Sequence, residues 1–124
     1  MLYLAFAIGL GAFGTHSLKG HLSARSLETF GTAHEYHVMA AVVLVLLGLM
    51  QGVWIAARLL GPSLLFFVGS LVFSGSLYML AVTGIKGLGA ITPIGGAMMI
   101  ASTVWVSAAL FRCFLNSAGP LEQG

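Results

Sequence analysis

Charged side chains are scarce in this sequence of 124 residues. Asp, Glu, Lys and Arg together make up 6% of the chain, whereas hydrophobic residues make up 59%. Soluble domains carry about 25% charged residues, because a compact fold in water must cover itself with polar side chains. The composition therefore excludes an ordinary soluble domain and favours a protein whose outer surface faces lipid.

The sequence also lacks a basic cluster and a cysteine pair. Its five Lys and Arg residues are scattered, so they cannot follow a phosphate backbone, and we expect no nucleic-acid partner. Cys113 is the single cysteine, which excludes an internal disulfide. No basic residue precedes the first apolar stretch, and this argues against a secretory signal peptide.

Long apolar stretches dominate the sequence. A membrane-spanning helix needs about 20 mostly apolar residues, and the chain has room for about four such spans in a single membrane domain, 1–124. We predict spans over about 1–18, 33–57, 62–82 and 93–115. The polar segment at about 19–32 predicts an interfacial turn and an amphipathic start to the second helix. The expected fold is an all-α membrane protein, a four-transmembrane-helix bundle in up-down-up-down order.

Small residues line several of the predicted spans. Ser70 and Ser74, like Ala97 and Ala101, are four residues apart, a spacing that lets helix backbones approach closely in lipid. We interpret such positions as helix-packing contacts rather than the lining of a pore. The predicted packing motifs comprise Gly11, Gly14, Ser74, Gly75, Ser76, Tyr78, Pro93, Gly95 and Gly96.

Histidines and carboxylates between positions 16 and 37 are the best candidates for a functional site. His34 and His37 are three residues apart on one helical face, where two imidazoles can share a metal ion. No third ligand at a fixed spacing accompanies them, so we expect an interfacial polar cluster, with neither a metal nor a cofactor. The cluster candidates are His16, His21, Glu28, His34, Glu35 and His37.

Two functional hypotheses differ in the role that they give to Glu35. A carboxylate inside the hydrocarbon is costly and indicates function, so a small permease or proton-linked channel could use Glu35 with the face of His34 and His37. A water-filled cavity reaching Glu35 would favour this hypothesis. We prefer a non-enzymatic component of the lipid bilayer that packs against other membrane proteins or forms a homo-oligomer. No motif of a hydrolase, zinc protease or nucleotide-binding enzyme occurs, so we expect no enzymatic activity.

Three sequence motifs resemble those of a known family. They are GAFGTH at 11–16, LVFSGSLYMLAVTG at 71–84 and ITPIGG at 91–96. In their order and spacing they resemble the small membrane proteins grouped as domain of unknown function 423, which include YgdD- and YwdK-like bacterial proteins and transmembrane protein 256-like eukaryotic proteins.

The resemblance implies a four-span protein of the bacterial cytoplasmic (inner) membrane with no established activity. Family members carry basic residues between spans two and three and at the C-terminus, where this chain has Arg58 and Arg112. The basic residues alone are close to a tie, because Lys19, Arg25 and Lys86 would share the other side of the membrane, but the resemblance favours both termini in the cytoplasm. Members also have residues before the first span, so we expect the native chain to start upstream of Met1.

Overall fold

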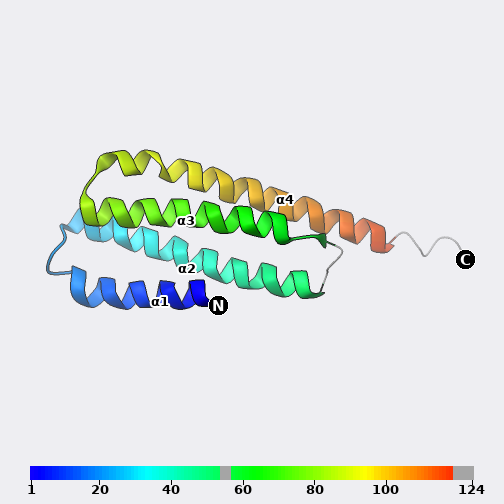
Figure 1. Cartoon of the computed structure of the whole chain (residues 1–124), viewed down its shortest axis with the longest axis horizontal. Helices are drawn as coiled ribbons and strands as arrows, with labels where there is room; N and C mark the ends of the chain where they lie inside the picture. Colours follow the sequence, from blue (N-terminus) through cyan, green and yellow to red (C-terminus); the bar gives the residue numbers. More distant parts are fainter. Residues whose placement is uncertain (54–56, 119–124) are drawn as a thin grey trace, which may run out of the picture.

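A computed structural model describes residues 1–53 and 57–118 of the chain. Every regular element among these residues is a helix (Figure 1). The elements are α1 (Leu2–Phe13), the π-helix η1 (Gly14–Leu18), α2 (Ala24–Val53), α3 (Leu60–Thr83), the short 3₁₀ helix η3 (Lys86–Ala90) and α4 (Thr92–Ala118). The predicted all-α class is confirmed for the described part of the chain.

Three helical stretches are long and apolar enough to cross a membrane. They are Ala24–Val53, Leu60–Thr83 and Lys86–Ser117, whereas the apolar helix Leu2–Leu18 is shorter. The described residues therefore have three clear candidate spans, and the first predicted span is the weakest of the four.

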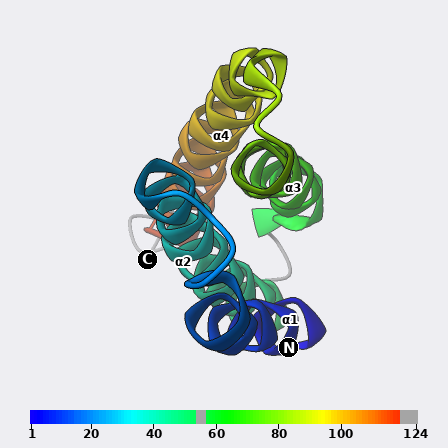
Figure 2. The same cartoon turned by 90° about the vertical axis from the view of Figure 1, so that its left-hand side faces the viewer.

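The helices form an open row, not the closed four-helix bundle that we predicted. α1 packs on α2, α2 on α3, and α3 on α4, and consecutive helices run in opposite directions (Figure 1). Figure 2, which looks along the helices, shows α1 and α4 at opposite ends with α2 and α3 between them. No close backbone contact joins α4 to α1 or α2 within 1–53 and 57–118. Lipid supplies no hydrophobic force that would close such a row, so one side of α3 stays open between α2 and α4.

The polar segment 19–32 is divided between a turn and a helix. The turn covers 19–23, and α2 begins at Ala24, well before the point where we expected its membrane span to start. The Ser23 hydroxyl accepts a hydrogen bond of 3.2 Å from the Ser26 N–H, as in a helix N-cap. α2 thus has 30 residues, about 45 Å at 1.5 Å per residue, and projects beyond the hydrocarbon. Trp54, whose indole suits the membrane interface, lies outside the described residues.

Proline and glycine stand at the ends of α3. Pro62 lies in the first turn, where a missing N–H costs nothing, and its side chain is buried. Gly84 ends the helix with φ of 71°, and its N–H donates to the Leu80 carbonyl at 2.8 Å. This left-handed conformation favours glycine, which has no Cβ to clash. α3 therefore starts and stops within two residues of the predicted span.

The buried core is small and the outer surface is apolar. Ala40, Phe66 and Met99 form the core cluster, one from each of α2, α3 and α4. Large apolar side chains elsewhere are exposed, and Leu2 and Phe114 are 90% and 69% exposed. Such a surface suits lipid, where helix contacts need close packing more than a wide hydrophobic core.

Candidate functional site

The predicted polar cluster does not form one site. His37 is 3% exposed and His34 is half-buried, whereas Glu28 and Glu35 are exposed on α2. His16 and His21 are exposed on η1 and in the turn, where His21 Nδ1 lies 3.0 Å from the Ser17 carbonyl oxygen. The structure therefore buries one member, His37, and leaves both carboxylates on the outer surface.

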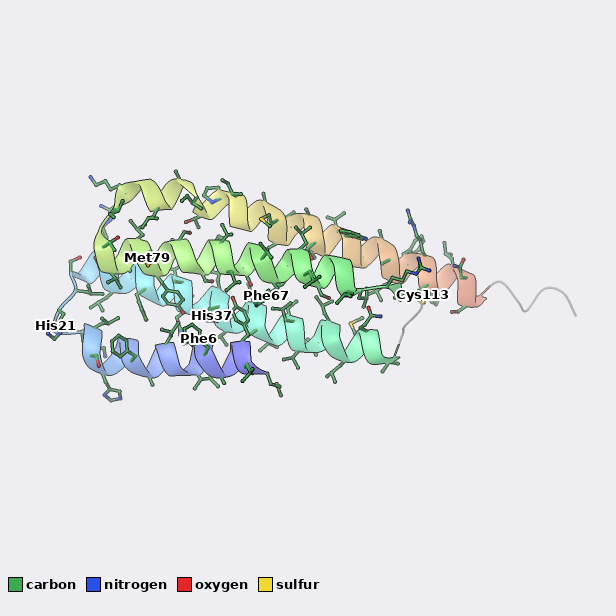
Figure 3. The ribbon with its side chains drawn as sticks, viewed as in Figure 1. Phe6, His21, His37, Phe67, Met79 and Cys113 are labelled. Carbon is green, nitrogen blue, oxygen red and sulfur yellow. The ribbon has the colours of Figure 1, made fainter. Side chains whose placement is uncertain are left out.

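His37 occupies the junction of three helices. Its ring centroid lies 4.3 Å from that of Tyr3 on α1 and 5.9 Å from that of Tyr78 on α3. Its Nδ1 shares a hydrogen bond of 3.3 Å with the Tyr78 hydroxyl. Figure 3 shows His37 between Phe6 of α1 and Phe67 of α3. One imidazole thus connects α1 to α3 through α2.

A second polar contact crosses the same junction. The Ser70 hydroxyl donates to the Phe67 carbonyl at 2.9 Å and lies 3.1 Å from the Tyr3 hydroxyl, so it accepts the proton of Tyr3. Ser74 lies one turn from Ser70 and is also buried. We call Tyr3, His37, Ser70 and Tyr78 the His37 junction.

Three buried polar atoms near the His37 junction have no hydrogen-bond partner. They are His34 Nδ1, His37 Nε2 and the Ser74 hydroxyl oxygen. Unpaired polar atoms in a dry interior cost free energy, and a ligand or a proton could satisfy them. Two imidazoles without a third donor do not make a metal site, however. Within 1–53 and 57–118 no group of three His, Cys, Asp or Glu side chains could hold a metal ion.

The predicted packing glycines divide into close contacts and open positions. A Cβ on Gly11 would lie 2.6 Å from the His34 ring, and one on Gly14 would meet the Phe30 ring. A Cβ on Gly95 would lie 2.7 Å from the Gly69 carbonyl oxygen. Gly96 has ordinary contacts with Phe73, whereas nothing lies within 4 Å of Gly75. Gly11 of α1 and Gly14 of η1 thus lie close against α2, and Gly95 brings α4 onto α3.

The remaining predicted packing residues act through hydroxyl groups and helix ends. The Ser76 hydroxyl donates to the Phe73 carbonyl and lies 2.7 Å from the Thr92 hydroxyl, so it joins α3 to the start of α4. Pro93, the second residue of α4, is exposed.

Tyr3 and Ser102 are two contact residues that no sequence pattern indicated. Ser102 is fully buried and donates to the Pro62 carbonyl at 2.6 Å, joining α4 to α3. A lone tyrosine or serine in an apolar stretch looks like a tolerated polar residue. A hydroxyl group in lipid needs a hydrogen-bond acceptor, and this requirement marks such residues as candidate contacts. The sequence does not identify the acceptor, however.

Tyr78→Phe should lower the free energy of unfolding by about 1 kcal/mol, because it removes the partner of a buried imidazole nitrogen. Tyr36→Phe is the matched control, since Tyr36 is 39% exposed on α2 and lies against Phe73. We expect the control to change stability by less than about 0.5 kcal/mol. Unfolding by sodium dodecyl sulfate in mixed micelles, followed by circular dichroism, measures both. Equal losses in the two variants would show that the His37–Tyr78 hydrogen bond contributes nothing of its own.

Comparison with known proteins identifies the family to which the chain belongs. A family model described as a protein of unknown function (DUF423) matches residues 10–96. The UPF0382 membrane protein YwdK of Bacillus subtilis is 41% identical over 112 residues, which cover 86% of this chain and 87% of the relative. The UPF0382 membrane protein SH2409 of Staphylococcus haemolyticus is 38% identical over 106 residues, 86% of each chain.

The comparisons bear out the resemblance seen in the sequence motifs and support a membrane location. No solved structure matches the chain significantly. Neither the family description nor the names of these relatives mentions an activity. The chain belongs to the DUF423 family of membrane proteins, whose function is not established.

Proposed function

We propose that this protein is a non-enzymatic membrane component that packs against a second copy or another membrane protein through the open side of its helix row. The observation that carries the proposal is a groove of about 610 Å³ between α2 and α4. The groove is lined by Tyr36, Met39, Val43, Phe66, Phe73, Gly96, Met99, Ile100, Thr103 and Val104. It exists because α2 and α4 do not meet over α3, and it would be filled in a closed bundle.

The walls of this groove are preformed. Phe66 and Met99 belong to the core cluster, and the Tyr36 and Phe73 rings pack with centroids 4.6 Å apart. Gly96 lies in the wall with no side chain, which lets a neighbouring helix approach closely. A fixed apolar groove loses little conformational entropy when a helix enters it.

A regular stripe on α2 runs beside the groove. Glu35, Met39, Val42, Leu46 and Leu49 are all exposed, and they alternate at spacings of four and three residues. This is the spacing by which two helices pack along a shared seam, in water and in lipid. Met39 belongs to both the stripe and the groove, so one partner helix could cover both.

The membrane arrangement is part of the same proposal. Leu2–Leu18 has 17 residues, about 25 Å of helix, which is near the lower limit for a span. We therefore count it as a fourth span, so both termini lie on one side of the membrane. The resemblance and the positions of Arg58 and Arg112 support a cytoplasmic location of that side in a bacterial cell.

Photo-crosslinking from the groove tests the packing function. We would place p-benzoylphenylalanine at position 100, where Ile100 lines the groove and is 68% exposed. Its matched control is position 64, where Leu64 is 55% exposed and does not line the groove. Ser102 bonds to Pro62 across the α3–α4 interface, so Ile100 and Leu64 lie at similar depths.

Irradiation in native membranes should give a discrete protein adduct from position 100 and none from position 64. Mass spectrometry then identifies a second copy or another membrane protein. Adducts with lipid alone from position 100, or the same adducts from both positions, would contradict the proposal.

The geometry gives the permease hypothesis less support. Glu35 is exposed and lines neither the groove nor the cavities at the two ends of the row. His37 is enclosed by aromatic side chains, and none of these cavities includes it. A proton path from Glu35 to His37 would need water that this packing does not accommodate.

A further inference from the structure

A basic cavity lies where α3 begins and α4 ends. It has a volume of about 460 Å³, and its lining includes Arg58, Trp105, Arg112 and Asn116. Among the described residues of the lining, both charged side chains are arginines, and no carboxylate contributes to it. The two described carboxylates, Glu28 and Glu35, belong to the first half of α2, at the opposite end of the row (Figure 1). Two guanidinium groups thus face one cavity without an acidic partner from the described residues.

Arg58 is held in an unusual backbone conformation. Its φ of 49° makes it the one non-glycine residue with positive φ within 1–53 and 57–118. A side chain in this left-handed region costs free energy that glycine would avoid. The free-energy cost of this conformation at Arg58 agrees with a role for its guanidinium group that glycine could not fill.

An apolar cleft adjoins the basic cavity. It has a volume of about 400 Å³ and is lined by Met50 of α2 and by Leu110 and Phe114 of α4, together with Cys113 and Ser117. Cys113 and Ser117 also line the basic cavity, so the two spaces are neighbours. Figure 3 places Cys113 at this end of the row. The combined site is cationic on one side and apolar on the other.

This combination selects an anionic amphiphile. Arginine pairs bind phosphate oxygens with directed, charge-assisted hydrogen bonds, and basic pockets between membrane helices accept lipid headgroups. The apolar cleft accepts a hydrocarbon chain, and the Trp105 indole suits the headgroup level. Inorganic phosphate would occupy the cationic part alone and leave the cleft empty.

We infer that Arg58 and Arg112 bind the phosphate of an anionic phospholipid, and that one acyl chain of this lipid enters the cleft between α2 and α4. The chain offers an internal comparison at the other end of the row. There Arg25 and Lys86 line a cavity of about 470 Å³, which shares no lining residue with the groove, the basic cavity or the apolar cleft. It carries the same number of basic residues as the basic cavity.

Trp105 provides the signal for the experiment. The sequence has two tryptophans, so Trp54→Phe leaves Trp105 as the one fluorophore of its kind. We would reconstitute this protein into phosphatidylcholine vesicles that contain a small fraction of phosphatidylglycerol brominated on its acyl chains. The comparison sample contains brominated phosphatidylcholine at the same mole fraction. Bromine quenches the indole when a lipid chain occupies the neighbouring cleft.

Brominated phosphatidylglycerol should quench Trp105 more strongly than brominated phosphatidylcholine. Arg58→Gln with Arg112→Gln should reduce the preference for phosphatidylglycerol about tenfold, because two charge-assisted hydrogen bonds are lost. Arg25→Gln with Lys86→Gln should leave the preference unchanged. Circular dichroism in the same vesicles establishes that each variant is folded.

Three results would overturn the inference. Equal quenching by the two brominated lipids would show that no anionic lipid is selected. An equal loss in both double variants would assign the preference to overall charge instead of this site. Displacement of phosphatidylglycerol by inorganic phosphate would show that the cavity binds a free anion and that the cleft adds nothing.

Discussion

Gly95→Ala should lower the free energy of unfolding by about 3 kcal/mol, the upper end of the usual cost of overpacking. The new Cβ would lie 2.5 Å from the Phe73 nitrogen and 2.7 Å from the Gly69 carbonyl oxygen. Both are backbone atoms of α3, so no side chain can rotate away, and α3 and α4 must separate. In lipid the stability of this interface depends on such close backbone approach, because no hydrophobic force compensates for a gap.

Gly75→Ala is the matched control for this prediction. Like Gly95, Gly75 is a helical glycine, but it lies in α3, and a Cβ there would have nothing within 4 Å. Alanine is the better helix former, so we expect this variant to be unchanged or more stable by up to about 1 kcal/mol. Unfolding by sodium dodecyl sulfate in mixed micelles compares the two. If both variants had the same stability, the contact between Gly95 and α3 would not limit the packing of these helices.

The position of the membrane helices follows from the sequence for a simple reason. A span is a local property, since about 20 apolar residues suffice to define it and proline or glycine sets its ends. Pro62 and Gly84 therefore located α3 within two residues. The start of α2 at Ala24 was harder, because the same amphipathic pattern suits an interfacial segment and the projecting end of a long helix.

The open row could not be deduced in the same way. Hydropathy says which residues meet lipid or protein but not which helix is the neighbour. Gly75 and Gly95 look alike in the sequence, and only the structure shows that Gly95 meets backbone whereas Gly75 meets nothing within 4 Å. A four-helix bundle and an open layer of helices satisfy the same apolar pattern, so hydropathy alone could not exclude the bundle that we predicted.

The candidate site was likewise predictable only in part. Histidines three residues apart were correctly placed on one helix, but the sequence could not say that His37 would be buried while Glu35 would be exposed. That outcome depends on Tyr3 and Tyr78, which come from two other helices. Tyr3 is 34 positions from His37, and no local pattern connects them.

His37→Ala should destabilise the protein by about 3 kcal/mol, because it removes a buried ring and leaves a cavity among aromatic neighbours. Tyr3 and Phe6 of α1 both pack against that ring, with centroid distances of 4.3 and 5.9 Å. Apart from these contacts and the contacts of Tyr3 with Ser70 and Phe67, the N-terminal helical segment is held mainly along the glycine seam at Gly11 and Gly14. We therefore expect α1 to loosen first, which hydrogen exchange of its amides in lipid nanodiscs measures as a local increase.

His21→Ala is the control for the removal of a histidine as such. His21 is exposed and the hydrogen bond of its side chain is to the Ser17 carbonyl, so the loss should stay below about 0.5 kcal/mol. His37→Phe distinguishes the two roles of the buried ring, since phenylalanine keeps the aromatic packing but leaves the Tyr78 hydroxyl without its partner. Combining His37→Phe with Tyr78→Phe removes both polar groups, and the double variant should recover most of the stability lost by His37→Ala. If the double variant were as unstable as His37→Ala, the imidazole would be required for more than packing, and a ligand or proton at its free Nε2 would become the leading explanation.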